Sequence, residues 1–162
     1  IVNEAIHEVG IQHLRGRIFN TLSDGERQKV MIAKALAQQT PIILLDEPTA
    51  FLDFPRKVET LLMLKRLAHQ LKKSILISTH DVEIALQLAD KIWLMEKLSA
   101  NQEKTENHNE EDHHDKKREG NSVLSVGTPQ ELADKGALSH FLDTPEITFD
   151  KRTMRIHFSM KS

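Results

Sequence analysis

The sequence lacks cysteine, long apolar runs and any excess of basic residues. Without cysteine there can be no disulfide, no Cys-ligated zinc and no Cys nucleophile, which fits a reducing compartment. No apolar run approaches the roughly 20 residues that a bilayer-spanning helix needs, so a membrane role would have to come through a partner. Lysine and arginine number 22 against 24 aspartates and glutamates, a net charge of -2, and this balance does not favour nucleic acid as a partner.

The 162 residues are enough for one domain with a hydrophobic core, and their spacing predicts an α/β fold. Apolar strands alternate with amphipathic helices, which favours parallel strands and right-handed crossovers. Because the run Ile42 to Leu45 is continuously apolar, we expect a strand buried on both faces in a sheet covered by helices. The expected helices are 2–9, 24–38, 56–71 (from the helical spacing of Leu61, Leu64, Ala68 and Leu71) and one after Asp81, and the expected strands are 42–45, 74–78 and 91–95.

Regular patterns stop between residues 97 and 121. Residues 101–119 contain seven acidic and four basic residues, three histidines and no large apolar side chain, a composition typical of a flexible insertion. A strand is expected again at residues 123–126. Residues 128–131 (Thr-Pro-Gln-Glu) then supply an N-cap, a first-turn proline and a capping box, and short strands are expected between residues 147 and 158.

The first motif that could carry chemistry lies at the start of the helix 24–38. Ser23 is placed to cap this helix, and Glu26 completes a capping box. A helix N-terminus offers free N–H groups and the positive end of the helix dipole, which suit a phosphate group. Ser23 adds a hydroxyl donor and Gly25 permits close approach of a backbone. Taken alone, such residues are more often an ordinary capping box.

Two further motifs follow neighbouring strands. Asp46 and Glu47 end the first strand, and because successive side chains of a strand point to opposite sides, one carboxylate can hold magnesium while the other faces a water molecule. His80 follows the second strand, at the edge where open α/β sheets bind ligands, and its imidazole can donate to an anion. By themselves, the carboxylates could be a solvated strand end and His80 a turn residue.

Together these motifs resemble those of the ATP-binding cassette (ABC) ATPases. Residues 22–28 (Leu-Ser-Asp-Gly-Glu-Arg-Gln) are similar to the signature motif of that family, and residues 42–47 to its Walker B strand with the catalytic glutamate. Residues 50–53 resemble the D-loop, and residues 78–81 the switch-histidine loop. The four occur in the family's order and at similar spacings, and residues 127–132 resemble the turn after the last core strands.

The resemblance implies a P-loop NTPase-type parallel sheet flanked by helices, with part of the ABC helical subdomain at the N-terminus. Residues 1–40 would be the C-terminal part of that subdomain, with the signature motif. Residues 41–96 would be the α/β core, residues 97–121 a flexible insertion and residues 122–162 the C-terminal strand and helix segment of the same domain.

The resemblance also implies roles for nine residues. In this family two ATPase domains sandwich two ATP molecules head to tail, so the chain would form a homodimer. Asp46 would bind Mg²⁺, Glu47 would act as the general base, and His80 would contact the γ-phosphate. Asp53 would connect the two sites. The residues expected to reach the ATP of the second domain are Leu22, Ser23, Asp24, Gly25 and Glu26.

Three features depart from the family pattern. Asp24 stands where the family most often has Gly, and Glu26 where it most often has Gln. A carboxylate beside ATP repels phosphate unless it points away or caps backbone N–H groups, and the capping box gives Glu26 that second role. No G-x-x-x-x-G-K-[ST] segment occurs, and the chain begins at Ile1 inside an expected helix. We therefore expect an incomplete domain that needs an upstream Walker A segment and is inactive by itself.

The implied function is hydrolysis of ATP to power an ABC transporter, at the cytoplasmic face of the inner (plasma) membrane and bound peripherally to transmembrane permease subunits. Residues 35–41 and 51–53 are similar to ATPases of importers for iron-siderophores, haem and cobalamin. One alternative is a soluble ABC-type ATPase that acts without a transporter. Another is a metal-binding module in the insertion, whose candidate ligands are His108, Glu110, Glu111, Asp112, His113, His114 and Asp115.

Overall fold

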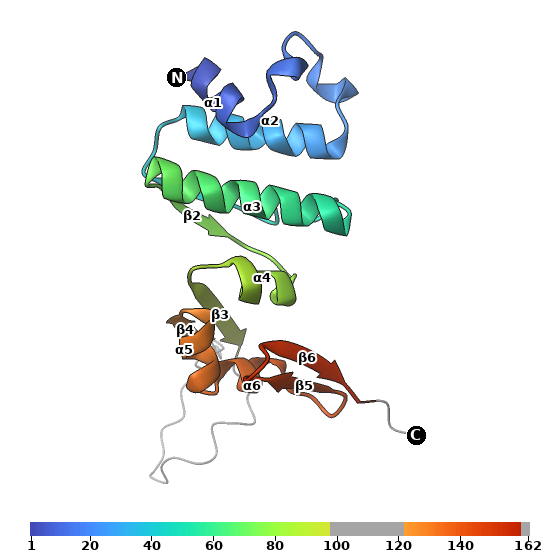
Figure 1. Ribbon diagram of the computed structural model, residues 1–162, viewed down its shortest axis with the longest axis vertical. Coiled ribbons are helices and arrows are strands. Elements are labelled where there is room, and N and C mark those ends of the chain that lie inside the picture. The colour runs from blue at the N-terminus through green and yellow to red at the C-terminus, as the bar shows by residue number, and fades with distance from the viewer. Residues whose placement is uncertain (98–121, 160–162) are drawn as a thin grey trace, which may run out of the picture. The chain divides into compact units, whose positions relative to one another are not determined.

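The computed structural model describes residues 1–97 and 122–159, which fold as two compact units, Ile1–Leu88 and Ala89–Ser162 (Figure 1). Almost all of the expected insertion, with every candidate metal ligand in it, lies outside the described residues. Within the described ranges, no helix combines the length and the apolar character that crossing a membrane requires.

The first unit begins with two helices at the predicted positions. Helix α1 (Val2–Val9) ends at Gly10, whose φ of 73° lies in the left-handed region that glycine adopts without strain. The short 3-10 turns η1 (Gln12–Leu14) and η2 (Phe19–Thr21) lead to helix α2 (Asp24–Ala37). Ile11, Leu14 and Leu22 of the connecting chain are buried in the core between the helices.

A parallel strand pair forms the sheet of the first unit. Strand β1 (Ile42–Leu45) pairs with strand β2 (Ser74–Ile77), as the sequence predicts, and helix α3 (Phe54–Leu71) is the crossover between them. Helix α4 (Val82–Leu88) follows β2. An ion pair of 2.8 Å between Lys29 Nζ and Glu59 Oε1 joins α2 to α3, which run side by side in Figure 1.

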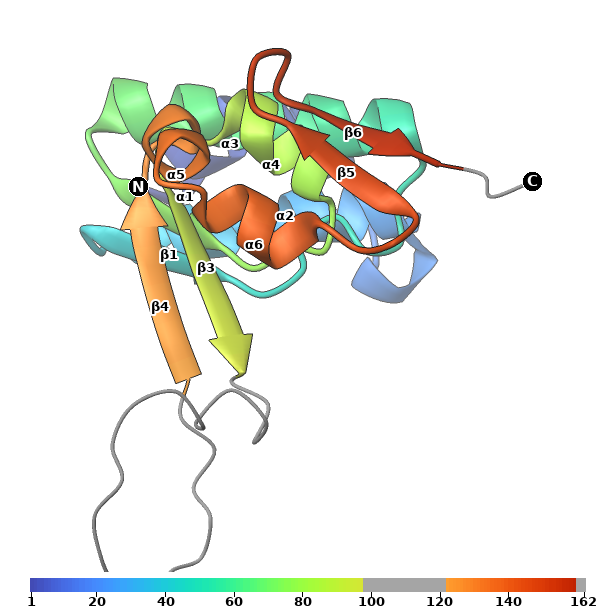
Figure 2. The ribbon, with the colours of Figure 1, turned by 90° about the horizontal axis from the view of Figure 1, so that it is seen from below.

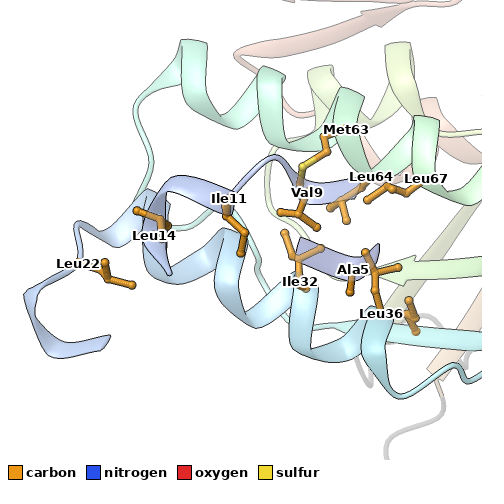
Figure 3. Close-up of a cluster of buried hydrophobic side chains, with 12 residues drawn as sticks. Ala5, Val9, Ile11, Leu14, Leu22, Ile32, Leu36, Met63, Leu64 and Leu67 are labelled. Carbon is orange, nitrogen blue, oxygen red and sulfur yellow. The ribbon is translucent and has the colours of Figure 1, made fainter. Parts of the chain in front are cut away.

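The core of the first unit lies where α1, α2 and α3 meet, with side chains from the three helices pointing toward one another (Figure 3). Ile32 of α2 and Leu64 and Leu67 of α3 are almost fully buried there. Burying such a side chain contributes about 1.5–3 kcal/mol. The cluster holds both α2 and the β1–α3–β2 crossover in place, and both elements carry predicted site residues.

One packing prediction, the burial of β1 on both faces, is wrong. The expected burial of β1 on both faces is not found, because Ile43 is 5% exposed while its neighbours Ile42 and Leu44 are 58% and 70% exposed. In the described residues, helices cover only one face of this pair. The buried residues of α3 are Thr60, Met63, Leu64 and Leu67, so only Leu64 of the four residues whose spacing predicts this helix is buried.

The described residues of the second unit form two antiparallel strand pairs and two short helices. Strand β3 (Ile92–Lys97) pairs with β4 (Ser122–Gly127), which run in opposite directions in Figure 2. We expected β3 to pair in parallel like β1 and β2, and its antiparallel pairing with β4 shows that this expectation is wrong for this pair. Consecutive strands that pair directly without a crossover run antiparallel. Helices α5 (Pro129–Asp134) and α6 (Ala137–Leu142) and strands β5 (Ile147–Asp150) and β6 (Arg155–Phe158) complete the unit.

Candidate functional site

The parallel register of β1 and β2 brings two predicted motifs together. Leu45 is the register partner of Ile77, so the next residues of both strands leave the sheet side by side. Asp46 and Glu47 therefore lie beside the segment from Ser78 to His80. This is the edge of a parallel sheet at which ligands bind in open α/β folds.

Glu47 and His80 are in direct contact across the two strand ends. The distance between Glu47 Oε1 and His80 Nε2 is 2.7 Å. Their side chains are 44% and 91% exposed, so the pair faces solvent and is accessible to a ligand. A carboxylate that accepts from an imidazole is held in one orientation, which suits a group that must position or deprotonate a water molecule.

Asp46 is held by the second strand as well. Ser78 Oγ donates to Asp46 Oδ1 at 2.5 Å and accepts from the backbone N–H of Glu47 at 2.9 Å. Glu47 has a φ of 42°, in the left-handed region, which costs a non-glycine residue about 1–3 kcal/mol and is found where function requires it. The strand therefore ends in a sharp, cross-braced turn that separates the two carboxylates.

The segment after Glu47 is anchored to helix α3. Thr49 is buried, and its carbonyl accepts from Leu52 N at 3.1 Å. Asp53 is the N-cap of α3 and accepts from Arg56 N at 3.0 Å. The structure thus gives Asp53, one of the predicted nucleotide residues, a capping bond at the start of its own helix, while Phe51 beside it is almost fully exposed.

The residue after His80 is tied to the same helix. Lys57 Nζ lies 2.9 Å from Asp81 Oδ2, and Thr79 Oγ1 accepts from Asp81 N at 3.0 Å. Both partners of the ion pair are partly buried. These bonds restrain the loop that carries His80, because they fix the backbone on one side of it.

The predicted capping box at the start of α2 is confirmed. Ser23 Oγ accepts from Glu26 N at 3.4 Å, and Glu26 Oε2 accepts from Ser23 N at 2.8 Å. Ser23 Oγ also donates to Glu26 Oε2 at 2.9 Å. The bonds that the carboxylate accepts, first from the Ser23 backbone N–H and then from the Ser23 hydroxyl, hold the pKa of Glu26 below its ordinary value of 4.5, and the positive charge of Arg17 acts in the same direction. The Glu26 carboxylate is therefore turned back onto its own helix start.

The other residues of the signature-like segment have different environments. Leu22 is 4% exposed and belongs to the core cluster, so its side chain packs inside the unit and does not face a ligand (Figure 3). Asp24 is exposed, and its Oδ1 is 3.5 Å from Arg27 Nη1. Gly25 has space beside it: a Cβ there would meet Leu52 Cδ2 at 3.7 Å, an ordinary contact.

Two shallow hollows border these residues. One, of about 150 Å³, lies between the start of α2 and the turn after β1, and both Asp24 and Glu47 line it. The other, of about 280 Å³, is lined by Ser23, Gly25 and Glu26 together with Arg56. The structure therefore brings Asp46, Glu47 and His80 into one cluster. The exposed start of α2 lies across a hollow from this cluster, and Leu52 lines the hollow between them.

The donor set at the strand ends fits magnesium better than a transition metal. Among the residues that the structure describes, no group of three or more histidine, aspartate or glutamate side chains could hold a metal ion. Magnesium is usually held by one or two carboxylates, by water and by substrate phosphates, so a single carboxylate such as Asp46 suffices. The bond from Ser78 does not exhaust the acceptor sites of that carboxylate.

The sequence analysis did not include Ser78 or Lys57 among the predicted site residues, although both bond to residues of this site. Ser78 could have been found, because a parallel register that ends at Leu45 and Ile77 places the next residues of the two strands beside each other. Lys57 carries no such signal, since its partner Asp81 is far away in the sequence and only the packing of α3 brings them together.

Comparison with known proteins finds the same architecture in ABC transporters. The family model described as "ABC transporter" matches residues 1–50. The structure of cbiO1 from Clostridium perfringens, part of the ABC transporter complex cbiONQ, superposes with a TM-score of 0.62 and 26% identity, covering 86% of this chain and 47% of that one. The chain has the fold of part of an ABC ATPase cassette. This cassette fold is a mixed α/β domain of the P-loop NTPase type.

Curated proteins similar to this chain include ATP-binding proteins of transporters. An uncharacterized ABC transporter ATP-binding protein of Methanocaldococcus jannaschii is 45% identical over 95 residues, which are 59% of this chain and 33% of the relative. The cobalamin import ATP-binding protein BtuD of Halobacterium salinarum is 37% identical over 92 residues, 57% of this chain and 23% of the relative. Other relatives are named for achromobactin transport and molybdenum import. The chain thus spans a third or less of the length of these two proteins.

Proposed function

We propose that this cassette belongs to the subunit of an ABC transporter that binds and hydrolyses ATP. The observation that carries the proposal is the 2.7 Å contact between Glu47 Oε1 and His80 Nε2, at the ends of two parallel strands and beside Asp46. Hydrolysis of a phosphoanhydride requires a positioned water molecule and stabilisation of charge on the phosphate, and little covalent chemistry. An exposed carboxylate next to an imidazole supplies both.

Each residue of the cluster has a separate task in this proposal. Glu47 orients the attacking water and accepts its proton as the oxygen bonds to the γ-phosphorus and the bond to ADP breaks. His80 donates a hydrogen bond to the γ-phosphate. Asp46 holds Mg²⁺, which neutralises phosphate charge when it is bound. The bonds of Ser78 to Asp46 and Glu47 keep the two carboxylates apart, which supports this division of tasks.

The start of α2 serves a second site in this proposal. Asp24 is exposed and Gly25 partly exposed there, and a helix N-terminus offers backbone N–H groups to a phosphate. These groups contact the ATP held by a second cassette. Leu22 contributes only its backbone to this contact, Glu26 caps the helix start, and Asp53 belongs to the neighbouring loop. The working unit is then a homodimer, attached peripherally to permease subunits at the cytoplasmic face of the membrane.

The division of the cassette follows from the same proposal. Residues 1–40 form the end of a helical subdomain, residues 41–96 carry the catalytic cluster, and residues 122–162 complete the domain. ATP is held by a P-loop in this fold class, and no G-x-x-x-x-G-K-[ST] occurs in these 162 residues. The measurements of ATP binding and hydrolysis below therefore use the chain within its transporter complex.

The replacement Glu47→Gln tests the catalytic role. Glutamine keeps the size and a hydrogen-bonding oxygen but cannot accept a proton, so ATP turnover should fall by about 10²–10⁴-fold while ATP binding is retained. Turnover is measured by release of phosphate, and binding by retention of labelled ATP on the purified complex. Glu83→Gln, at an exposed position in the first turn of α4, is the matched control and should leave both unchanged. Unchanged turnover in Glu47→Gln would refute the role of Glu47 as the base.

We further propose that the transporter imports a metal chelate, an iron-siderophore or haem, or cobalamin. The similarity of residues 35–41 and 51–53 to such importers supports this, as does the relative named for cobalamin import. The relatives named for molybdenum import offer the competing solute. Cells without the gene should lose uptake of labelled ferric siderophore, haem or cobalamin and keep uptake of molybdate. The reverse pattern would exclude the chelate class and leave the ATPase proposal intact.

A further inference from the structure

We propose that Ser78 is a positioning residue that sets the geometry of both carboxylates, Asp46 and Glu47. This inference rests on the ATPase function proposed above, but its physical basis can be measured without nucleotide. Ser78 Oγ joins the two residues across the strands: it donates to Asp46 Oδ1 at 2.5 Å and accepts from Glu47 N at 2.9 Å.

The two bonds use a serine hydroxyl in a way that few side chains can reproduce. A hydroxyl has one donor and two acceptor sites, so one oxygen can serve a carboxylate and a backbone N–H at the same time. The bond to the carboxylate is charge-assisted and short, which makes it the stronger of the two. Ser78 therefore fixes the side chain of one residue and the backbone of the next, on either side of a single peptide bond.

The backbone of Glu47 needs such a restraint. Its φ of 42° is unusual for a residue with a side chain, and a less strained conformation would point the carboxylate in another direction. The carboxylate now lies 2.7 Å from His80 Nε2. Because His80 follows Ser78 by two residues on the same loop, the Ser78 bond to Glu47 N fixes the distance between the two groups of the pair.

Removal of the hydroxyl should loosen the turn without unfolding the protein. Asp46, Glu47 and Ser78 are all exposed, so water can take over the lost bonds in Ser78→Ala. Water does not impose the same direction on the two groups. The loss is therefore expected in geometry and exchange at the site rather than in overall stability.

The test is amide hydrogen exchange of the unliganded protein, followed by NMR. In Ser78→Ala the exchange of the Glu47 amide should become about five- to tenfold faster, the change expected when one such bond is lost. Ser78→Thr keeps a hydroxyl and should stay close to the unmodified protein. Ser74→Ala, at the exposed other end of β2, is the matched control and should leave the Glu47 amide unchanged.

Each result decides the inference. Faster exchange in Ser78→Ala alone supports it. Equal acceleration in Ser74→Ala and Ser78→Ala would mean general loosening of the strand and would overturn it, as would no change in Ser78→Ala. If Ser78→Ala does not fold, the unmodified protein still answers: a Glu47 amide that exchanges at the rate of a free peptide has no partner, and the inference fails.

A kinetic measurement on the transporter complex separates this inference from the proposed function. A positioning defect should lower kcat for ATP in Ser78→Ala by about tenfold and leave KM nearly unchanged, with recovery in Ser78→Thr. If kcat is unchanged although the Glu47 amide exchanges faster in Ser78→Ala, Ser78 restrains the turn without positioning the two carboxylates, and the inference is overturned. A complex of the unmodified chain that does not hydrolyse ATP would instead refute the proposed function, whatever the exchange result.

Discussion

Gly25 is a residue whose identity the fold of this chain does not require. It does not have a positive φ, and the space next to it accommodates a Cβ in ordinary contact with Leu52. Within α2, glycine is a poorer helix former than alanine by about 0.8–1.0 kcal/mol. A glycine that weakens its own helix and fills no steric need points to close approach of something outside the chain.

We predict that Gly25→Ala raises the stability of the fold but weakens the association of two copies of the chain. The free energy of unfolding should rise by up to about 1 kcal/mol, because alanine favours the helix. Association of two cassettes driven by Mg²⁺-ATP should weaken, because the added methyl group keeps the nucleotide of the second copy away. Urea denaturation measures the first effect, and sedimentation of the Glu47→Gln complex with and without ATP measures the second.

Gly136→Ala is the matched control for this prediction. Gly136 has a φ of 75°, so an alanine there is strained and should lower stability by about 1 kcal/mol or more. A loss of stability in Gly25→Ala as large as in Gly136→Ala would show that the fold itself requires Gly25, and the association argument would fall.

The individual site residues could be predicted to different degrees. Asp46, Glu47 and His80 were expected at neighbouring strand ends, and they meet there because a parallel register needs only the two strand positions. Leu22 shows the limit of a motif: it stands in the signature-like segment, yet its side chain is buried in the core. A motif gives the order of residues but does not say which of them act through the backbone.

At the scale of the elements, local signals were the most reliable. Both capping boxes, Ser23 with Glu26 and Thr128 with Glu131, form as the sequence predicts, because each needs only four consecutive residues. The buried stripe of α3 could not be read from the same sequence. Apolar side chains lie on several sides of that helix, and the packing of α1 and α2 against it selects the buried ones.

The capping box of α2 leads to a prediction about pH. The pKa of Glu26 is lowered in the folded protein, so its carboxylate stabilises the fold above its ordinary pKa of 4.5 and loses this effect as the pH falls through the lowered value. Glutamine fits a capping box but does not titrate. The unmodified protein should therefore exceed Glu26→Gln in stability near neutral pH, and the difference should shrink below pH 4.5. Urea denaturation at a series of pH values measures it.

Ser23→Ala provides the control for the pH effect. Its backbone N–H remains, but the hydroxyl that bonds the Glu26 side chain at 2.9 Å is gone. In a Ser23→Ala background the pH dependence assigned to Glu26 should decrease. An undiminished dependence would show that the Ser23 hydroxyl does not contribute, and would leave the Ser23 backbone N–H and Arg17, whose Nη1 lies 3.1 Å from Glu26 Oε1, as the causes.

At the scale of the whole molecule, the α/β class was predictable and the layering was not. A continuous apolar run predicts a strand with two covered faces, but in the described residues helices cover only the face of Ile43 and Leu45, while Ile42, Leu44 and Leu76 are exposed. The partner of β3 was also unexpected, because pairing depends on where the chain returns and not on the composition of the strand. These features belong to the arrangement of elements, which single segments do not encode.

The uneven burial of β1 can be tested with neighbouring residues of one strand. Ile43→Thr places a hydroxyl in the core and should lower the free energy of unfolding by about 2–4 kcal/mol. Leu44→Thr changes a side chain that is 70% exposed, so its effect should stay within about 0.5 kcal/mol, since threonine suits a strand. Urea denaturation of the two variants gives both values. An equal loss in Leu44→Thr would mean that the second face of the sheet is covered in solution, because only contact with another surface can make an exposed leucine contribute as much as a buried isoleucine.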